Sequence, residues 1–262
     1  VPEGVLACVT GKGSEIGDYL VSHKGVSMIA FTGSSETGAH IAKTASMIPF
    51  LFECGGNNPV LVCDDGDIEL AAKEIVKGAF SYSGQRCTGI KYVLARQETA
   101  NVLIPAVLQA MDTMVSMGNP HDEGTKLVGP LIDPSVAQGI KQAIDEAVGA
   151  GATIVRGGMV DGAYMTPTIL TNVQPDMRVV AQEMFGPIVS FLVVSSYEEA
   201  VSIMNASEYG LQASIFTADE GKGLAIAKTI QTGTVQINGS PQRGPDHFPF
   251  MGIKKSGLGV QG

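Results

Sequence analysis

Residues 26–47, VSMIAFTGSSETGAHIAKTASM, show most clearly how this chain folds. The first part is mainly apolar and ends in Gly33, which is typical of a short buried strand before a tight turn. The second part predicts a helix, for which Ser34 or Ser35 is a suitable N-cap. The stretch therefore predicts a strand, a glycine turn and a helix in succession.

The same order of elements is predicted before and after this stretch. Residues 4–11, GVLACVTG, predict a strand that ends in glycine, and residues 14–25 predict a helix. Residues 58–65, NPVLVCDD, predict a third strand, and residues 67–84 a third helix. Because consecutive parallel strands need crossover helices, the repetition predicts an α/β fold with a largely parallel sheet.

The alternation continues along the rest of the chain. Helices are predicted at residues 98–117, 135–152, 196–207 and 221–233. Strands are predicted at residues 153–158, 164–173, 188–196, 213–218 and 233–239. The glycine-rich stretch GGMVDGAY, residues 157–164, is typical of a loop.

Charge and cysteine usage exclude several classes of protein. With 17 basic and 26 acidic residues the net charge is −9, which argues against nucleic acid or an anionic membrane as partner. The four cysteines have no CxxC spacing, which favours a reducing compartment, and we expect the cytoplasm. There is neither a basic signal-peptide start nor an apolar run long enough for a membrane span, and no pattern predicts a metal site.

A cysteine in GQRCT, residues 84–88, is the candidate nucleophile. Cys87 follows the predicted helix beyond Gly84, and the neighbouring Arg86 is expected to stabilise its thiolate and lower its pKa. The other three cysteines lie in or beside apolar strands, where cysteine behaves as a small hydrophobic residue. An unreactive loop cysteine remains the alternative.

Three further stretches carry residues suited to chemistry. Glu53 lies in the apolar run FLFECGG, where burial should raise its pKa and make it usable as a base. Gly33 and Ser34 place free backbone N–H groups and a hydroxyl at a helix start, which suits a phosphate. Glu183 and Phe185 in EMFGP suit ribose hydroxyls and a flat ring. Each also has a purely structural interpretation, as a strand-edge glutamate, a capped turn and a helix-to-strand turn.

Six motifs together resemble the aldehyde dehydrogenase superfamily. They are FTGSSETG (31–38), ECGG (53–56), GQRC (84–87), EMFGP (183–187), NASEYGLQASIFT (205–217) and KKSGLG (254–259). They occur in the family's order and at its approximate spacing, across essentially the whole chain. The resemblance implies part of a Rossmann-type dinucleotide domain plus an α/β catalytic domain with a mostly parallel sheet.

The resemblance also implies NAD(P)-dependent aldehyde oxidation with roles at matching positions. Cys87 is similar to the family's nucleophile and Glu53 to its general base. The implied cofactor contacts are Gly33, Ser34, Cys54, Glu183 and Phe185. Cys54 stands where an aliphatic residue is usual, and we expect only a change in packing there.

Within the superfamily, residues 78–91 and 243–262 resemble the non-phosphorylating glyceraldehyde-3-phosphate dehydrogenases of glycolysis. This implies oxidation of glyceraldehyde 3-phosphate to 3-phosphoglycerate with NADP, NAD being possible, through a thiohemiacetal and a thioester. Arg86 and Arg243 would hold the substrate phosphate, and Thr88 with Arg86 would position the aldehyde. Two planar guanidinium groups suit such a clamp.

The family's chains are nearly twice this long, so we expect a fragment or an incomplete chain that lacks the asparagine of the oxyanion hole. We expect residues 1–54 to be the remaining dinucleotide-binding part, residues 55–240 the catalytic domain, and residues 241–262 a substrate loop and return segment. The resemblance implies a homotetramer for the full-length protein.

Three alternatives to this function remain open. The first is a dehydrogenase of another aldehyde, such as a semialdehyde whose carboxylate both arginines would accept. The second is a non-catalytic fragment that binds cofactor poorly. The third is a redox-sensing role for Cys87.

Overall fold

The computed structural model describes every residue from Val1 to Gly262. The helices are α1 (Gly13–Ser22), α2 (Ser35–Thr44), α3 (Ile68–Phe80), α4 (Gln97–Met114), α5 (Pro134–Gly149), α6 (Arg178–Ala181), α7 (Tyr197–Ala206) and α8 (Glu220–Ala227), with a short 3₁₀ turn η1 (Ser81–Gly84). The strands are β1 (Ile29–Thr32), β2 (Phe50–Glu53), β3 (Asn58–Val62), β4 (Ile90–Arg96), β5 (Ser116–Met117), β6 (Leu127–Val128), β7 (Thr153–Arg156), β8 (Val160–Asp161), β9 (Tyr164–Met165), β10 (Thr168–Thr171), β11 (Ile188–Val194), β12 (Tyr209–Gly210), β13 (Gln212–Phe216), β14 (Thr234–Ile237), β15 (Ile253–Lys254) and β16 (Gly257–Leu258).

A seven-stranded sheet forms the centre of the larger unit. Its strand order is β14-β13-β3-β4-β11-β10-β7. All neighbours are parallel except β7, which runs antiparallel to β10 at one edge. This confirms the predicted α/β fold with a mostly parallel sheet.

Helices cover both faces of this sheet. Successive strand residues point to opposite sides, and apolar side chains on both sides need to be buried. Val60 and Val62 of β3 belong to one buried cluster together with residues of α3 and α4. Leu61 between them belongs to a second cluster with residues of α5 and α7. The central strands are therefore mainly apolar, and both of their faces are covered.

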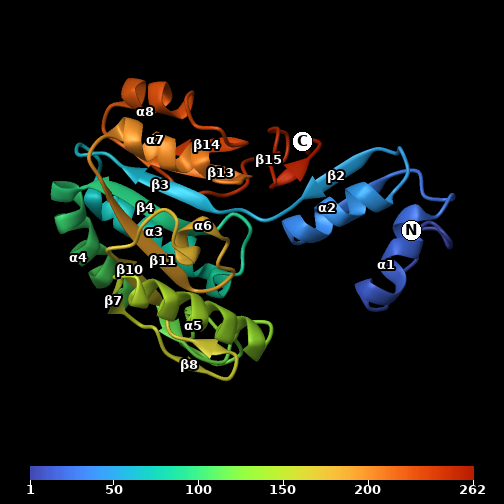
Figure 1. Ribbon diagram of the computed structural model, residues 1–262, viewed down its shortest axis with the longest axis horizontal. Coiled ribbons are helices and arrows are strands. Elements are labelled where there is room, and N and C mark those ends of the chain that lie inside the picture. The colour runs from blue at the N-terminus through green and yellow to red at the C-terminus, as the bar shows by residue number, and fades with distance from the viewer.

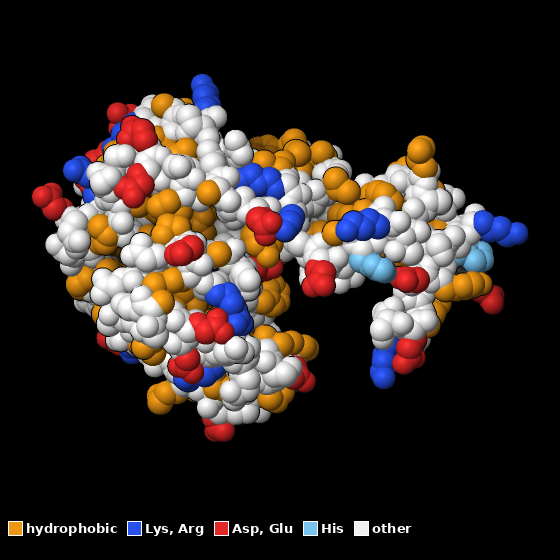
Figure 2. Space-filling view, in the orientation of Figure 1, with side chains coloured by type: hydrophobic (Ala, Val, Ile, Leu, Met, Phe, Trp, Pro, Cys, Tyr) orange, Lys and Arg blue, Asp and Glu red, His pale blue; other side chains and the backbone are white.

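A smaller unit lies at the other end of the molecule, where Figure 1 shows α2 next to β2 and α1 beyond α2. Its sheet has the order β1-β2-β16, with β1 parallel and β16 antiparallel to β2. Ile41 of α2 packs there against Phe52 and Cys54. The chain passes from β2 directly into β3, so residues 54–57 connect the two sheets. An open notch separates the two units on the side shown in Figure 2.

The predicted strand at residues 4–11 is wrong. The segment has no regular structure, and Val5, Leu6 and Val9 are 69%, 82% and 68% exposed. No strand of either sheet pairs with it. An apolar segment without a pairing partner does not form a strand, because its backbone hydrogen bonds would stay unmade.

Two other segments differ from prediction. The expected loop at residues 157–164 contains a hairpin, in which β8 pairs with β9 and Gly162 takes a φ of +56° at the turn. Strand β4 was not predicted, although it is the middle strand of the large sheet and all its residues except Arg96 are buried.

Candidate active site

Cys87 lies in a tightly held turn between α3 and β4. The turn begins with three successive left-handed residues, Tyr82, Ser83 and Gly84, at φ values of 54°, 59° and 69°. A Cβ at Gly84 would lie 2.0 Å from the Gly186 carbonyl oxygen, so only glycine allows this approach. The left-handed turn stops the helix and sends the chain past Cys87 into the sheet.

The start of β3 and the end of the connection before it hold the backbone of Cys87 in place. The Asn58 side-chain amide donates to the Cys87 carbonyl at 2.7 Å and to the Gly89 carbonyl at 2.8 Å. Gly56 lies so close that an added Cβ would be 2.2 Å from the Cys87 carbonyl oxygen. These contacts fix the backbone that carries the sulfur.

The expected lowering of the Cys87 pKa is wrong. Burial raises the pKa of the thiol, and the charges of Glu183 and Glu53 raise it further. The backbone N–H groups of Cys87 and Thr88 act in the opposite direction. Both carboxyl groups therefore lie within electrostatic reach of the sulfur, although they come from distant parts of the chain.

Arg86 does not act on the thiol as expected, because its guanidinium is engaged elsewhere. It donates to Ser81 Oγ at 2.6 Å, to Thr88 Oγ1 at 3.0 Å and to the Pro241 carbonyl at 3.3 Å. Arg86 and Thr88 thus lie together beside Cys87. The contact with Pro241 brings the segment that contains Arg243 to the same place.

Glu53 ends strand β2 and is only 7% exposed. Neither of its carboxylate oxygens has a hydrogen-bond partner. Burial raises the pKa of Glu53, and the charge of Arg243 partly opposes this. The raised pKa agrees with the apolar flanks of this residue, and its role as a base remains a prediction.

Glu183 and Phe185 lie next to the connection between the sheets. Glu183 Oε1 accepts a hydrogen bond from the Gly56 N–H at 3.1 Å, and a Cβ on Gly55 would lie 2.2 Å from Oε2. Burial raises the Glu183 pKa, while Lys91 and the Gly56 N–H lower it. Phe185 is 40% exposed, so its ring is available to a ligand.

The start of α2 differs in detail from the prediction. Ser34 is the N-cap, and its hydroxyl accepts from the Thr37 N–H at 3.1 Å. The Gly33 N–H is not free, because it donates to the Glu53 carbonyl at 3.2 Å. Ser35, by contrast, has a buried hydroxyl without a partner, facing Gly55. Ser35 is therefore better placed than Gly33 to contact a cofactor.

The side chain of Cys54 packs between the small sheet and α2. It is 4% exposed, and a Cβ on Gly38 would lie 2.7 Å from its sulfur. Its backbone N–H donates to the Ser256 carbonyl at 2.9 Å. The thiol thus fills space in the core of the small unit, and a contact of Cys54 with the cofactor remains a prediction.

Arg243 lies on the segment between β14 and β15. Its guanidinium donates to Gln261 Oε1 at 2.9 Å, pairs with Asp246 at 3.7 Å and lies 5.8 Å from the Phe250 ring centroid. It is half-exposed, and its charge reaches Glu53. One face of this cation is therefore open to an anionic ligand.

Sequence reasoning missed Asn58, Ser35 and Lys91 as site residues. Asn58 begins the predicted strand NPVLVCDD, and a polar residue at the start of a buried strand was an available signal. Lys91 had no comparable signal, because nothing in IKYVLAR shows that this lysine points into the protein. The structure has no cluster of three or more His, Cys, Asp or Glu side chains suited to a metal ion.

A family model described as "Aldehyde dehydrogenase family" matches residues 1–262. The chain belongs to the aldehyde dehydrogenase family. It is 44% identical over 261 residues to the NADP-dependent glyceraldehyde-3-phosphate dehydrogenase of Pisum sativum, covering 100% of this chain and 52% of that relative. The corresponding protein of Streptococcus equinus is 45% identical over 262 residues, covering 100% of this chain and 54% of the relative.

Solved aldehyde dehydrogenase structures show the same fold. The NADP-dependent glyceraldehyde-3-phosphate dehydrogenase of Bacillus halodurans C-125, complexed with NADP, superimposes with a TM-score of 0.93 at 48% identity. That match covers 97% of this chain and 53% of the solved chain. The chain thus spans about half the length of its relatives. None of its helices combines the length and apolar character of a membrane span.

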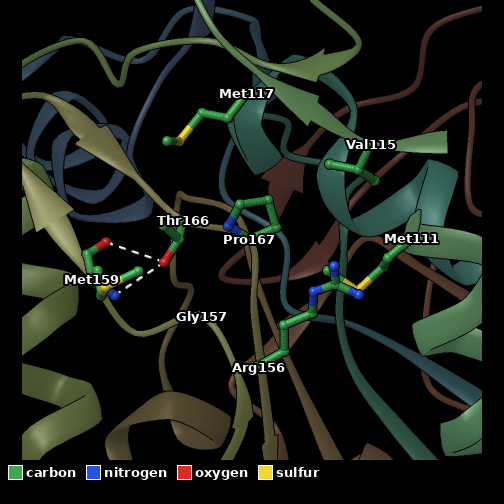
Figure 3. Close-up of a pocket in the computed structure, with 8 residues that line it drawn as sticks. All are labelled: Met111, Val115, Met117, Arg156, Gly157, Met159, Thr166 and Pro167. Atoms are coloured by element: carbon green, nitrogen blue, oxygen red, sulfur yellow. Dashed lines mark hydrogen bonds between the residues drawn. The ribbon is translucent and has the colours of Figure 1, made fainter. Parts of the chain in front are cut away.

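A separate pocket of about 310 Å³ lies near the β7 edge of the large sheet (Figure 3). It is lined by Met111, Met117 and Met159 together with Arg156. Arg156 pairs with Asp112 at 2.6 Å, so its charge is already balanced. The pocket contains none of the predicted site residues.

Proposed function

We propose that this chain carries the nucleophile, general base and phosphate-binding arginines of an NADP-dependent dehydrogenase that oxidises glyceraldehyde 3-phosphate to 3-phosphoglycerate. The observation that carries the proposal is the meeting of Cys87, Glu53 and Glu183 around the sheet connection. The relatives and solved structures named for this activity support the choice of substrate and cofactor.

The residues around the connection are compatible with a dinucleotide. Ser35 contributes an unpartnered buried hydroxyl at the start of α2, a ten-residue helix whose N-terminus favours a phosphate. Gly55 leaves no side chain between Glu183 and this helix. Ser34, Ser35, Glu183 and Phe185 would hold the cofactor. A bound nicotinamide would supply the acceptor for the hydride that leaves the aldehyde carbon.

Cys87 begins the proposed reaction as a thiolate. Cys87 is partly exposed, so its proton can pass to solvent, and Glu53 stays unprotonated for the later hydrolysis. The sulfur then forms a bond to the aldehyde carbon while the carbonyl electrons move to oxygen. The Cys87 N–H is one candidate donor to that oxyanion.

Glu53 acts after hydride loss has produced a thioester on Cys87. It accepts a proton from water, the hydroxide attacks the thioester carbon, and the acid leaves as the thiolate reforms. A carboxylate with a raised pKa suits this step, since it is a stronger base than an exposed one. Arg243 and Arg86 would hold the substrate phosphate while its aldehyde carbon lies at the Cys87 sulfur.

A dehydrogenase of another aldehyde is the alternative that the comparisons favour. A lactaldehyde dehydrogenase of Methanococcus maripaludis is 40% identical over 262 residues. Its substrate, by name, has no phosphate. The chemistry at Cys87 and Glu53 would be the same, and only the use of the two arginines would differ.

Activity towards three aldehydes separates these functions. The protein should oxidise glyceraldehyde 3-phosphate with a far higher kcat/KM than succinic semialdehyde or lactaldehyde, and with NADP better than with NAD. Cys87→Ser is the control, and it should abolish all three activities. Equal or greater activity with either unphosphorylated aldehyde would overturn the substrate assignment. Calorimetry with NADP on the 262-residue chain tests the non-catalytic alternative separately.

A further inference from the structure

Lys91 is a buried cation that the proposed reaction does not use. It lies on β4, four positions after Cys87, and is only 2% exposed. Its ammonium donates to the Gly84 carbonyl at 2.8 Å and to the Met184 carbonyl at 3.0 Å. A lysine is rarely buried so completely unless its charge has specific partners.

The two carbonyls belong to the two loops that form the candidate site. Gly84 ends the left-handed turn that leads to Cys87. Met184 lies between Glu183 and Phe185, and the ammonium is also 5.5 Å from the Phe185 ring centroid. One charged group thus joins the nucleophile turn to the loop expected to contact the cofactor.

The charge of Lys91 also balances the acidic groups around the sulfur. Glu183 and Cys87 both interact favourably with the ammonium, whereas Arg86 opposes its charge. Lys91 in turn lowers the pKa of Glu183. Glu53 and Glu183 both raise the thiol pKa, and Lys91 is the buried cation whose charge interacts with the same thiol.

We propose that Lys91 is a positioning residue, whose ammonium holds the Cys87 turn against the Glu183–Phe185 loop and whose charge favours the Cys87 thiolate. The inference rests on the proposed function for its consequence in catalysis. The predicted effect on the ionisation of the Cys87 thiol does not depend on that function. A neutral side chain at position 91 would leave both carbonyls without a charged donor and Cys87 facing two carboxyl groups.

Burial makes the link that Lys91 forms between the two loops sensitive to pH. It lowers the Lys91 pKa to about 8, so the ammonium is charged at neutral pH and loses its proton as the pH rises through that value. The groups that act on it are Glu183, Cys87 and Arg86. Above this pH the loops lose their charged link.

Alkylation of Cys87 by iodoacetamide tests the inference without turnover. The experiment uses the Cys8→Ser background, since Cys8 is exposed, and follows Cys87 by peptide mass spectrometry across pH. Lys91→Met and Lys91→Gln should each slow alkylation at pH 7 by about 10-fold, equivalent to one pKa unit on the thiol. Lys91→Arg keeps the charge and should restore much of the rate. Lys73→Met, at an exposed position, is the matched control.

Lys91→Gln separates charge from hydrogen bonding, because its amide still donates to a carbonyl. It also keeps the test informative if Lys91→Met does not fold. Wild-type alkylation profiles in both neutral variants, with only a lowered melting temperature, would overturn the inference. A changed profile in a protein that oxidises no aldehyde would support the role of Lys91 and reject the proposed function instead.

Discussion

The guanidinium of Arg86 donates a hydrogen bond to the Pro241 carbonyl at 3.3 Å, across 155 positions of sequence. In the proposed site Arg86 anchors the segment that carries Arg243, and it also lies beside Cys87, where it would bind the substrate phosphate. The hydrogen bond and the ion pair of Arg243 go to Gln261 and Asp246 within its own C-terminal segment. The two arginines should respond differently to mutation.

Arg243→Ala should raise KM for glyceraldehyde 3-phosphate by about 10-fold to 100-fold, the usual effect of losing a charge-assisted hydrogen bond. KM for an uncharged aldehyde should stay unchanged, because that substrate has no phosphate for this side chain to hold; any effect of the lost charge on the pKa of Glu53 should change kcat equally for both substrates. Steady-state kinetics with both substrates measures the difference. Equal losses for both would contradict the phosphate-binding role. Arg96→Ala, at a half-exposed ion pair with Asp64, is the matched control.

Gly56→Ala should destabilise the fold by about 2–3 kcal/mol, the upper part of the usual range for overpacking. Its new Cβ would lie 2.2 Å from the Cys87 carbonyl oxygen, which is backbone and cannot rotate away. Urea unfolding measures the change. Gly139→Ala in α5 is the matched control, because nothing lies within 4 Å of its added Cβ, and it should stabilise by about 1 kcal/mol. Equal stability of the two variants would disprove the close approach.

Glu53→Gln should permit one burst of hydride transfer and then stop. The amide cannot accept the proton of the hydrolytic water, so the thioester on Cys87 would accumulate. Absorbance of reduced nicotinamide after rapid mixing measures the burst, and intact mass detects the acyl group. Steady turnover by this variant would remove the assignment of Glu53 as the base.

Glu53 should also make stability depend on pH. Its folded pKa lies above the unfolded value, so the native state holds the proton more tightly, and this stability is lost as the pH rises from the unfolded pKa through the folded one. Glu53→Gln should therefore unfold at a higher temperature than wild type at pH 8, with a smaller difference at pH 4. Thermal melts at both values test this. A variant less stable than wild type at pH 8 would show that the carboxylate has a partner.

Local sequence determined those features that depend on near neighbours. The strand–glycine–helix order, the Ser34 cap and the alternation that forms the parallel sheet follow from residues within one or two turns of each other. The raised pKa of Glu53 belongs here too, since the apolar run before it ends in the buried Phe52, with Phe50 and Leu51 half-buried.

Only the tertiary structure decided the electrostatics at Cys87. The sequence places Arg86 next to it, but the fold turns that guanidinium towards Pro241 and brings Glu53 and Glu183 to the sulfur. The fold likewise buries Lys91 and leaves residues 4–11 without a strand to pair with. A buried charge needs a partner group, and a strand needs a neighbouring strand. Both partners come from distant parts of the chain, so the adjacent residues do not specify them.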